Sequence, residues 1–145
     1  MSINIIKKPE WGLLYYHFQD YCTSAETVKA TQEATKDYPK GKLTTIFNLL
    51  KCKLDIEKTN DVRQIIAENK RLFENGIITT HAAILTQNES LTIFLKAFEL
   101  LMVDVPTKIR IFSSLSDGLA WIGLREHEQE LYLLLNKIPK HPERA

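Results

Sequence analysis

The stretch IRIFSSLSDGLAWIGL, residues 109–124, decides the fold of this chain. A run of branched and aromatic residues at its start predicts a strand over 107–112 (TKIRIF). The tetrapeptide SLSD at 114–117 resembles a capping box with Asp in place of Glu, so a helix is expected through Trp121. Gly123 is positioned to end that helix. The stretch therefore predicts a strand that turns directly into a helix carrying a large aromatic residue.

Three serines in this stretch raise a regulatory alternative. Ser113, Ser114 and Ser116 could each carry a phosphate. They also lie where a strand must turn into a helix, and capping alone accounts for at least one of them. We interpret the stretch as structural, with Phe112 and Trp121 fastening the last strand and its helix to the core.

The start of the chain predicts an antiparallel strand pair and a helix. Residues 3–7 (INIIK) and 13–21 (LLYYHFQDY) are rich in branched and aromatic residues, and Pro9 to Gly12 separate them. The tetrapeptide TSAE at 23–26 has the form of a capping box, in which the hydroxyl and the carboxylate satisfy backbone donors. A helix is therefore expected to run to about residue 36.

Hydrophobic periodicity, capping residues and turn residues predict the secondary structure of the rest of the chain. Asn60 or Asp61 is expected to cap one further helix, and Gly76 to end it. The expected elements are a largely buried strand at 43–50, a polar loop at 51–60, a helix at 61–75, a strand at 77–86, a helix at 89–104, and a C-terminal helix at 125–138 with a tail at 139–145.

The order of these elements predicts a single α/β domain, for which 145 residues is a suitable length. An antiparallel first pair followed by strand-helix units gives a mixed sheet of about five strands covered by helices. Strands 43–50 and 77–86 are apolar on both faces. Strand 13–21 mixes apolar and polar residues, so we expect it to be less covered.

Three features together resemble a known family: the strand HAAILT at 81–86, the apolar helix NESLTIFLKAFELL at 88–101, and the stretch at 109–124. They are similar to the SpoIIAA-like branch of the STAS (sulfate transporter and anti-sigma-factor antagonist) superfamily. The resemblance covers about residues 1–124, with 125–138 as a closing helix of the same domain. It implies a small regulatory or interaction module. Some members are controlled by phosphorylation of a Ser after the third strand, and related domains hold nucleotide or lipid.

The phosphorylation turn of that family matches this chain poorly. Bacterial antagonists carry Asp-Ser-Ser-Gly or a close variant, whereas this chain has EKTND at 57–61. Only Thr59 offers a hydroxyl there, and a phosphate on it would lie near a helix N-terminus with positive charge nearby. The alternative is an ordinary loop or N-cap threonine. The candidate partner or phosphate surface comprises Lys58, Thr59, Asn60, Asp61 and Arg63, with the loop 51–60.

The sequence carries no recognised catalytic or nucleotide-binding motif: G-x-S-x-G, H-E-x-x-H, Walker A and G-x-G-x-x-G are all missing. Cys22 and Cys52 lie far apart, in no zinc or disulfide spacing, so reduced core or near-core thiols are expected. The histidines are dispersed, and the acidic neighbours of His127 do not share a helical face with it. We expect no enzyme, no cofactor and no metal.

The sequence leaves more than one interpretation open for several polar and aromatic residues. His81 is either an acid-base group or a histidine satisfied by a hydrogen bond. Asn69 either points into a pocket or faces an edge. The aromatic residues of strand 13–21 line a pocket, form an exposed surface, or pair within the core; they are Tyr15, Tyr16, Phe18 and Tyr21.

The amino-acid composition limits the classes of partner that the protein is expected to bind. Lys plus Arg is 19 and Asp plus Glu is 18, a near-balance that gives no strong field for nucleic acid. No signal peptide or span of about 18 apolar residues is present, which predicts a cytoplasmic protein. We expect a non-enzymatic module with a protein partner, either monomeric or homodimeric. The alternative is a carrier or sensor of a small molecule or lipid, with an apolar pocket between the sheet and helices 61–75 and 89–104.

Overall fold

The structure, a computed structural model, describes residues 3–54, 59–89, 96 and 106–139. Within them one sheet has the strand order β1-β2-β3-β4-β5, in which β1 and β2 are antiparallel and all later neighbours are parallel. The strands are β1 (Ile3–Lys8), β2 (Leu13–Cys22), β3 (Gly41–Leu54), β4 (Ile77–Leu85) and β5 (Lys108–Phe112). The predicted mixed five-stranded α/β fold is confirmed.

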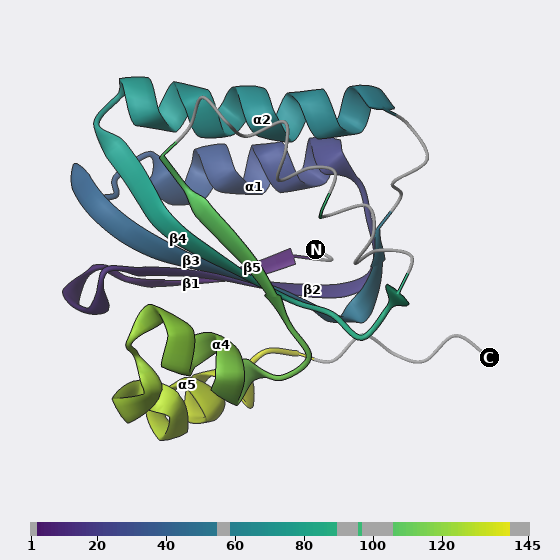
Figure 1. The fold of residues 1–145 in the computed structure, drawn as a ribbon, viewed down its shortest axis with the longest axis vertical. Coiled ribbons are helices and arrows are strands. Elements are labelled where there is room, and N and C mark those ends of the chain that lie inside the picture. Colours follow the sequence, from purple (N-terminus) through teal and green to yellow (C-terminus); the bar gives the residue numbers. More distant parts are fainter. Residues whose placement is uncertain (1–2, 55–58, 90–95, 97–105, 140–145) are drawn as a thin grey trace.

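Helices cover both faces of this sheet. They are α1 (Ser24–Thr35), α2 (Thr59–Glu74), α4 (Leu115–Ile122) and α5 (Glu128–Leu135). Figure 1 shows α1 and α2 over one face and α4 and α5 over the other. Each interface has its own apolar cluster: Tyr16, Phe18 and Leu72 belong to the first, and Tyr15 and Leu119 to the second. The domain therefore has three layers, with the sheet in the middle.

Two predicted caps explain where helices begin. The backbone N–H of Glu26 donates to Thr23 Oγ1 at 3.2 Å, which starts α1. The Glu26 carboxylate accepts a hydrogen bond from the same hydroxyl at 3.3 Å. Ser114 caps α4 in the same way, because its hydroxyl accepts the N–H of Asp117 at 3.3 Å. Each cap satisfies a backbone donor that the first helical turn leaves unpaired.

Residues 107–124 contain the predicted strand and helix, β5 and α4. β5 pairs with β4 in parallel, and Ile109 of β5 lies opposite Ala82. Trp121 of α4 packs against the second cluster, with its ring centroid 5.6 Å from that of Phe112. Gly123 ends α4 with a left-handed φ of 78°, which glycine adopts without a Cβ clash.

The expectation that the second strand is less covered is wrong. Leu14, Tyr16 and Phe18 on one face of β2 and Leu13 and Tyr15 on the other are all buried. The reason is position: β2 lies between β1 and β3, with helices over both faces. Among its polar residues Gln19 is buried as well, whereas Asp20 near the end of the strand is exposed.

Several predicted boundaries also shift. Residues 51–54, expected in a loop, continue β3 because they pair with the end of β2. α2 begins at Thr59, so Asn60 and Asp61, expected just before the helix, lie inside its first turn. The C-terminal segment starts as a 3-10 turn at Arg125–His127, and α5 ends at Leu135, before the expected residue 138. Most of the helix expected at 89–104, and the tail from residue 140, lie outside the described residues.

Candidate functional site

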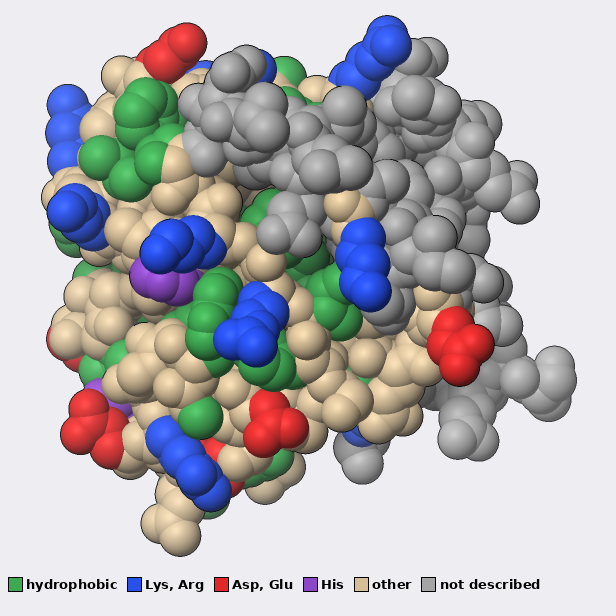
Figure 2. Space-filling view, viewed as in Figure 1, with side chains coloured by type: hydrophobic (Ala, Val, Ile, Leu, Met, Phe, Trp, Pro, Cys, Tyr) green, Lys and Arg blue, Asp and Glu red, His purple; other side chains and the backbone are tan. Residues whose placement is uncertain are grey.

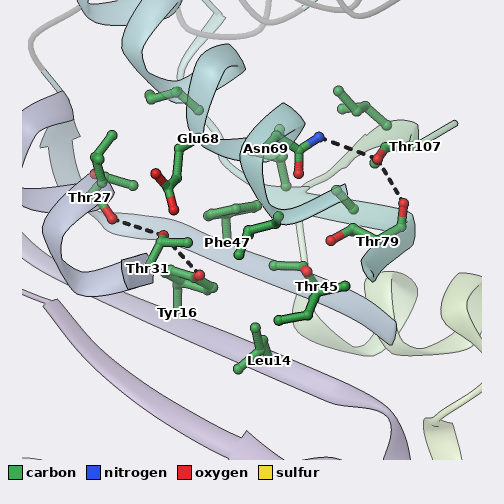
Figure 3. A pocket seen from close by; sticks show the side chains of 17 residues that line it. Leu14, Tyr16, Thr27, Thr31, Thr45, Phe47, Glu68, Asn69, Thr79 and Thr107 are labelled. Carbon is green, nitrogen blue, oxygen red and sulfur yellow. Dashed lines mark hydrogen bonds between the residues drawn. The ribbon is translucent and has the colours of Figure 1, made fainter. Parts of the chain in front are cut away.

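A cavity of about 80 Å³ lies between the sheet and the helices α1 and α2. Strands β2 to β5 supply its floor, and the two helices supply its roof (Figure 3). The lining side chains are mostly apolar or threonine: Leu14, Tyr16, Thr27, Val28, Thr31, Thr45, Phe47, Ile65, Glu68, Asn69, Leu72, Ile77, Thr79, Ala82, Ile84, Thr107 and Ile109. A pocket is therefore present between the sheet and the helix expected at 61–75, with α1 as a second wall that the sequence did not indicate. The helix at 89–104, expected as the other wall, lies mostly outside the described residues.

A chain of hydroxyl groups forms the wall of the pocket on the α1 side. Thr31 Oγ1 lies 2.9 Å from the carbonyl oxygen of Thr27 and 2.9 Å from the hydroxyl of Tyr16. Because the Thr31 proton goes to the Thr27 carbonyl, the Tyr16 hydroxyl must donate to Thr31. The Tyr16 oxygen then keeps its lone pairs for an acceptor role toward the pocket. Burial raises the pKa of Tyr16 to about 12, so its proton stays in place at neutral pH.

A second hydrogen-bonded chain stands at the opposite end of the pocket (Figure 3). The Asn69 side-chain nitrogen donates to Thr107 Oγ1 at 3.4 Å, and Thr107 donates to the carbonyl of Thr79 at 2.7 Å. Asn69 therefore points into the pocket, the first of the two interpretations of this residue. With its amide nitrogen directed at Thr107, the Asn69 carbonyl oxygen is an acceptor.

Glu68 brings a carboxylate to the roof of the pocket. Its side chain is only 7% exposed and is held by Arg71, whose Nε donates to the two carboxylate oxygens at 3.0 and 3.1 Å. Gln32 of α1 donates a further hydrogen bond at 3.3 Å. The Glu68 carboxylate raises the pKa of Arg71, which keeps the guanidinium charged. These donors hold the Glu68 carboxylate in place at the roof of the pocket.

Three polar groups of the pocket can act as acceptors. They are the Tyr16 hydroxyl oxygen, the Glu68 carboxylate and the Asn69 carbonyl. Among the lining residues that the structure describes there is no Lys, Arg or His. A ligand anion would meet a carboxylate with no cation to balance it in the lining, whereas a ligand O–H or N–H group would find an acceptor.

The surface proposed from the sequence falls at the start of α2. Lys58 is outside the described residues, and Thr59, Asn60 and Asp61 fall in the first turn of α2. The structure therefore places four of the five residues on one helical segment. Arg63, the member of this set whose side chain is described, is exposed and does not line the pocket. On the face shown in Figure 2, cationic and anionic side chains of the described residues are interspersed.

His81, considered as an acid-base group, and His127 both have structural partners. His81 Nδ1 lies 3.1 Å from Thr80 Oγ1, and its ring meets that of Trp121 edge-on at 5.0 Å. His127 stacks on Trp11 with ring centroids 4.1 Å apart. Its Nε2 also lies 3.6 Å from a Glu126 carboxylate oxygen, a contact that the sequence argument excluded. That exclusion assumed an α-helix, whereas these two residues lie in a 3-10 turn.

The core interpretation holds for the aromatic residues of β2 whose side chains are described. Tyr15 is fully buried and its hydroxyl accepts from the Asn48 amide at 2.7 Å. Phe18 lies 6.2 Å from Phe47 between ring centroids. Tyr16 belongs to both interpretations, because it is buried in the core and also lines the pocket.

The threonines of α1 are the site residues that sequence reasoning missed. Thr27, Thr31 and Thr35 are buried, and the hydroxyls of Thr31 and Thr35 donate to carbonyls one turn earlier. Their spacing of four residues was a usable signal, because it places three hydroxyls on one helical face. A buried helix face is usually recognised by its large apolar residues, and a face rich in Ala and Thr gives a much weaker hydrophobic pattern.

Comparison with known proteins supports the fold. No protein-family model and no curated protein matches the chain. A solved structure of an uncharacterized protein from the DUF3478 family, with a SpoIIAA-like fold, from Shewanella loihica PV-4, is similar to it. The TM-score is 0.54 at 14% sequence identity, over 83% of this chain and 91% of that one. The chain therefore has a SpoIIAA-like α/β fold, as its sequence pattern predicted.

Within the part of the chain that the structure describes, no helix is both long enough and apolar enough to span a bilayer.

Proposed function

We propose that this protein is a non-enzymatic binding module whose pocket, between the sheet and the helices α1 and α2, takes a small, uncharged, largely apolar molecule with a hydrogen-bond donor. The observation that carries the proposal is the pairing of an apolar cavity with acceptor groups at both ends. Pockets of this composition, apolar with a few convergent polar groups, are the usual form of small-molecule sites.

The size of the cavity limits the ligand. Its volume of about 80 Å³ is smaller than the roughly 150 Å³ of a cavity that accepts benzene. A short aliphatic alcohol fits that space, as does the end of a longer molecule. Ligands this small bind weakly, because even the best contribute only about 1.5 kcal/mol for each heavy atom.

The polarity of the lining selects the head group. A carboxylate or phosphate brought against the Glu68 carboxylate would be repelled, and the described lining offers no cation to offset this. An alcohol loses its hydrogen bonds to water on entry but regains one at Tyr16, Glu68 or Asn69. The proposal therefore favours an alcohol over a fatty acid of equal chain length.

Nuclear magnetic resonance titration with 1-butanol and with butyrate tests this selection. We expect 1-butanol to give saturable shifts of backbone amides in α1, α2 and β4 at neutral pH. Butyrate at equal concentration should leave those amides unchanged. Equal shifts from the two probes, or no saturable shift from 1-butanol, would contradict the proposal.

A pair of matched variants locates the binding. Ala82 is buried and lines the pocket, so Ala82→Leu should fill it and abolish the 1-butanol shifts. Ala67→Leu makes the same change on an exposed position of α2 and should bind like the wild type. If circular dichroism shows that Ala82→Leu does not fold, Asn69→Leu replaces it, since this change removes an acceptor from the pocket and leaves the apolar floor unchanged.

A second candidate function is a protein-interaction module, and one observation favours it. Tyr132 and Leu133 are neighbours on α5 and are 45% and 64% exposed. A second copy of the chain is a fitting partner, because the near-zero net charge causes no long-range repulsion between copies. Sedimentation should then show a dimer that Leu133→Lys disrupts, while Phe73→Lys, at an exposed apolar residue on α2, leaves it intact.

A further inference from the structure

Cys22 and Cys52 are thirty residues apart in sequence but meet at the end of the sheet. Cys22 is the last residue of β2, and Cys52 lies in the part of β3 that extends beyond the predicted strand. Both belong to the apolar cluster beneath α1 and α2. Their thiols form a hydrogen bond, which lowers the pKa of the first thiol of the pair to ionise and raises the pKa of the second.

An irregularity in strand pairing brings the two thiols to the same face. His17 pairs with Asn48, but Gln19 pairs with Lys51, so β3 advances three residues while β2 advances two. As a result Cys52 lies opposite Asp20, and side chains alternate along a strand, so Cys22 shares the face of Asp20. Without the extra residue in β3, Cys52 would pair with position 21 and point to the opposite face.

Solvent access differs between the two sulfurs. Cys22 is fully buried, and Cys52 is partly exposed. A small oxidant therefore reaches Cys52 first, with Cys22 held beside it as the second thiol. An accessible cysteine next to a resolving cysteine is the usual arrangement of a reversible thiol oxidation site.

We propose that Cys22 and Cys52 form a thiol oxidation site at which hydrogen peroxide converts the pair into a reversible intramolecular disulfide. The Cys52 sulfur takes one oxygen from peroxide to become a sulfenic acid, and one water is released. The Cys22 sulfur then attacks the Cys52 sulfur and displaces hydroxide, which leaves with the Cys22 proton as a second water. The two thiols are oxidised by two electrons and one peroxide is reduced to two waters.

The disulfide would fasten the end of β2 to β3 at the point where α1 begins. Cys22 directly precedes Thr23, the capping residue of α1. The bond would close a loop that contains the whole of α1, which restricts the unfolded chain more than the folded one. The oxidised protein should therefore melt at a higher temperature than the reduced protein, and dithiothreitol should reverse the difference.

Intact mass measurement of the full chain after treatment with hydrogen peroxide tests the proposal. We expect a loss of about 2 Da, the mass of two hydrogens, and a non-reducing peptide map that joins Cys22 to Cys52. A wild-type product that gains about 16 or 32 Da on Cys52, or a dimer linked between chains, would overturn the proposal. This measurement needs no variant, so a folding defect cannot obscure it.

Two variants define the order of events. In Cys22→Ala the resolving thiol is missing, so dimedone should trap a sulfenic acid on Cys52. In Cys52→Ala the buried Cys22 should resist peroxide under conditions that convert the wild type completely. Equal trapping by dimedone in the wild type and in Cys22→Ala would show that Cys22 does not resolve the sulfenic acid, which contradicts the proposed chemistry.

Discussion

The hydroxyls of Tyr16 and Thr31 lie 2.9 Å apart and join the second strand to the first helix above it. The direction of this hydrogen bond is fixed, because the Thr31 proton is directed at the carbonyl of Thr27. Tyr16 is the donor and Thr31 the acceptor. Both side chains are buried, so this pair fixes α1 against the sheet at the wall of the pocket.

Removing the Tyr16 hydroxyl and removing the Thr31 hydroxyl should lower the free energy of unfolding by different amounts. Tyr16→Phe deletes the donor and leaves Thr31 bonded to Thr27, so we expect a loss of about 1 kcal/mol in the free energy of unfolding. Thr31→Val strands the Tyr16 hydroxyl without its acceptor, so about 2 kcal/mol is expected. Urea denaturation measures both. A smaller cost for Thr31→Val than for Tyr16→Phe would mean that water in the cavity satisfies the Tyr16 hydroxyl.

Tyr16 should also make stability depend on alkaline pH. Burial raises its pKa in the folded protein from the ordinary value of 10.0 to about 12. Between these values the unfolded chain has lost a proton that the folded protein keeps, so the free energy of unfolding falls as pH rises above 10. Each pH unit in this interval contributes about 1.4 kcal/mol.

The measurement is urea denaturation of the wild type and of Tyr16→Phe across that pH interval. The advantage of the wild type should be complete below pH 10 and shrink toward pH 12. Burial also raises the pKa of Tyr15, so the variant should keep part of the pH dependence. A constant difference between the two proteins would contradict the prediction.

Gly118 permits the close approach of α4 to β4. A Cβ at this position would lie 2.9 Å from Leu85 Cδ2 and 3.6 Å from Ala83 Cβ. Alanine favours a helix over glycine by about 1 kcal/mol, but overpacking costs about 1 to 3 kcal/mol. Because Leu85 is fully buried and its side chain has little room to move, we expect Gly118→Ala to be destabilising.

A double-mutant cycle separates the two effects. In a Leu85→Ala background the contacting methyl is gone, so Gly118→Ala should become neutral or stabilising by up to about 1 kcal/mol. Chemical denaturation of the four proteins gives the coupling energy. Equal effects of Gly118→Ala in both backgrounds would show that the contact with Leu85 is not the constraint.

Local signals in the sequence predicted the helix starts at Thr23 and Ser114, because a cap depends on residues within one turn. The same local reasoning failed for residues 51–54. Their sequence, KCKL, has too few apolar residues to indicate a strand, and pairing with the end of β2 supplies what propensity does not. Long-range partners decided this element, and no short window of sequence contains them.

The sequence likewise indicated some features of the candidate site and missed others. An apolar pocket between the sheet and the helices at 61–75 and 89–104 was the alternative hypothesis from the sequence, and a place in a pocket was one of the interpretations of Asn69. The wall formed by Thr27 and Thr31 was missed, since small polar residues carry little hydrophobic signal. The meeting of Cys22 and Cys52 depends on one extra residue in the pairing of β2 with β3, a register that the sequence does not reveal.

Ser114 provides the last test, because it separates capping from the regulatory interpretation of the three serines. Its hydroxyl accepts the Asp117 N–H, so Ser114→Ala should lower the free energy of unfolding by about 1 kcal/mol. Ser114→Asp keeps an acceptor and places a negative charge at the helix N-terminus, so it should remain within about 0.5 kcal/mol of the wild type. Ser113 is exposed, and Ser113→Ala serves as the matched control with no expected change. Thermal and urea unfolding of the three variants measure the effect. If Ser113→Ala and Ser114→Ala were equally destabilising, the cap would not be the source of the stability.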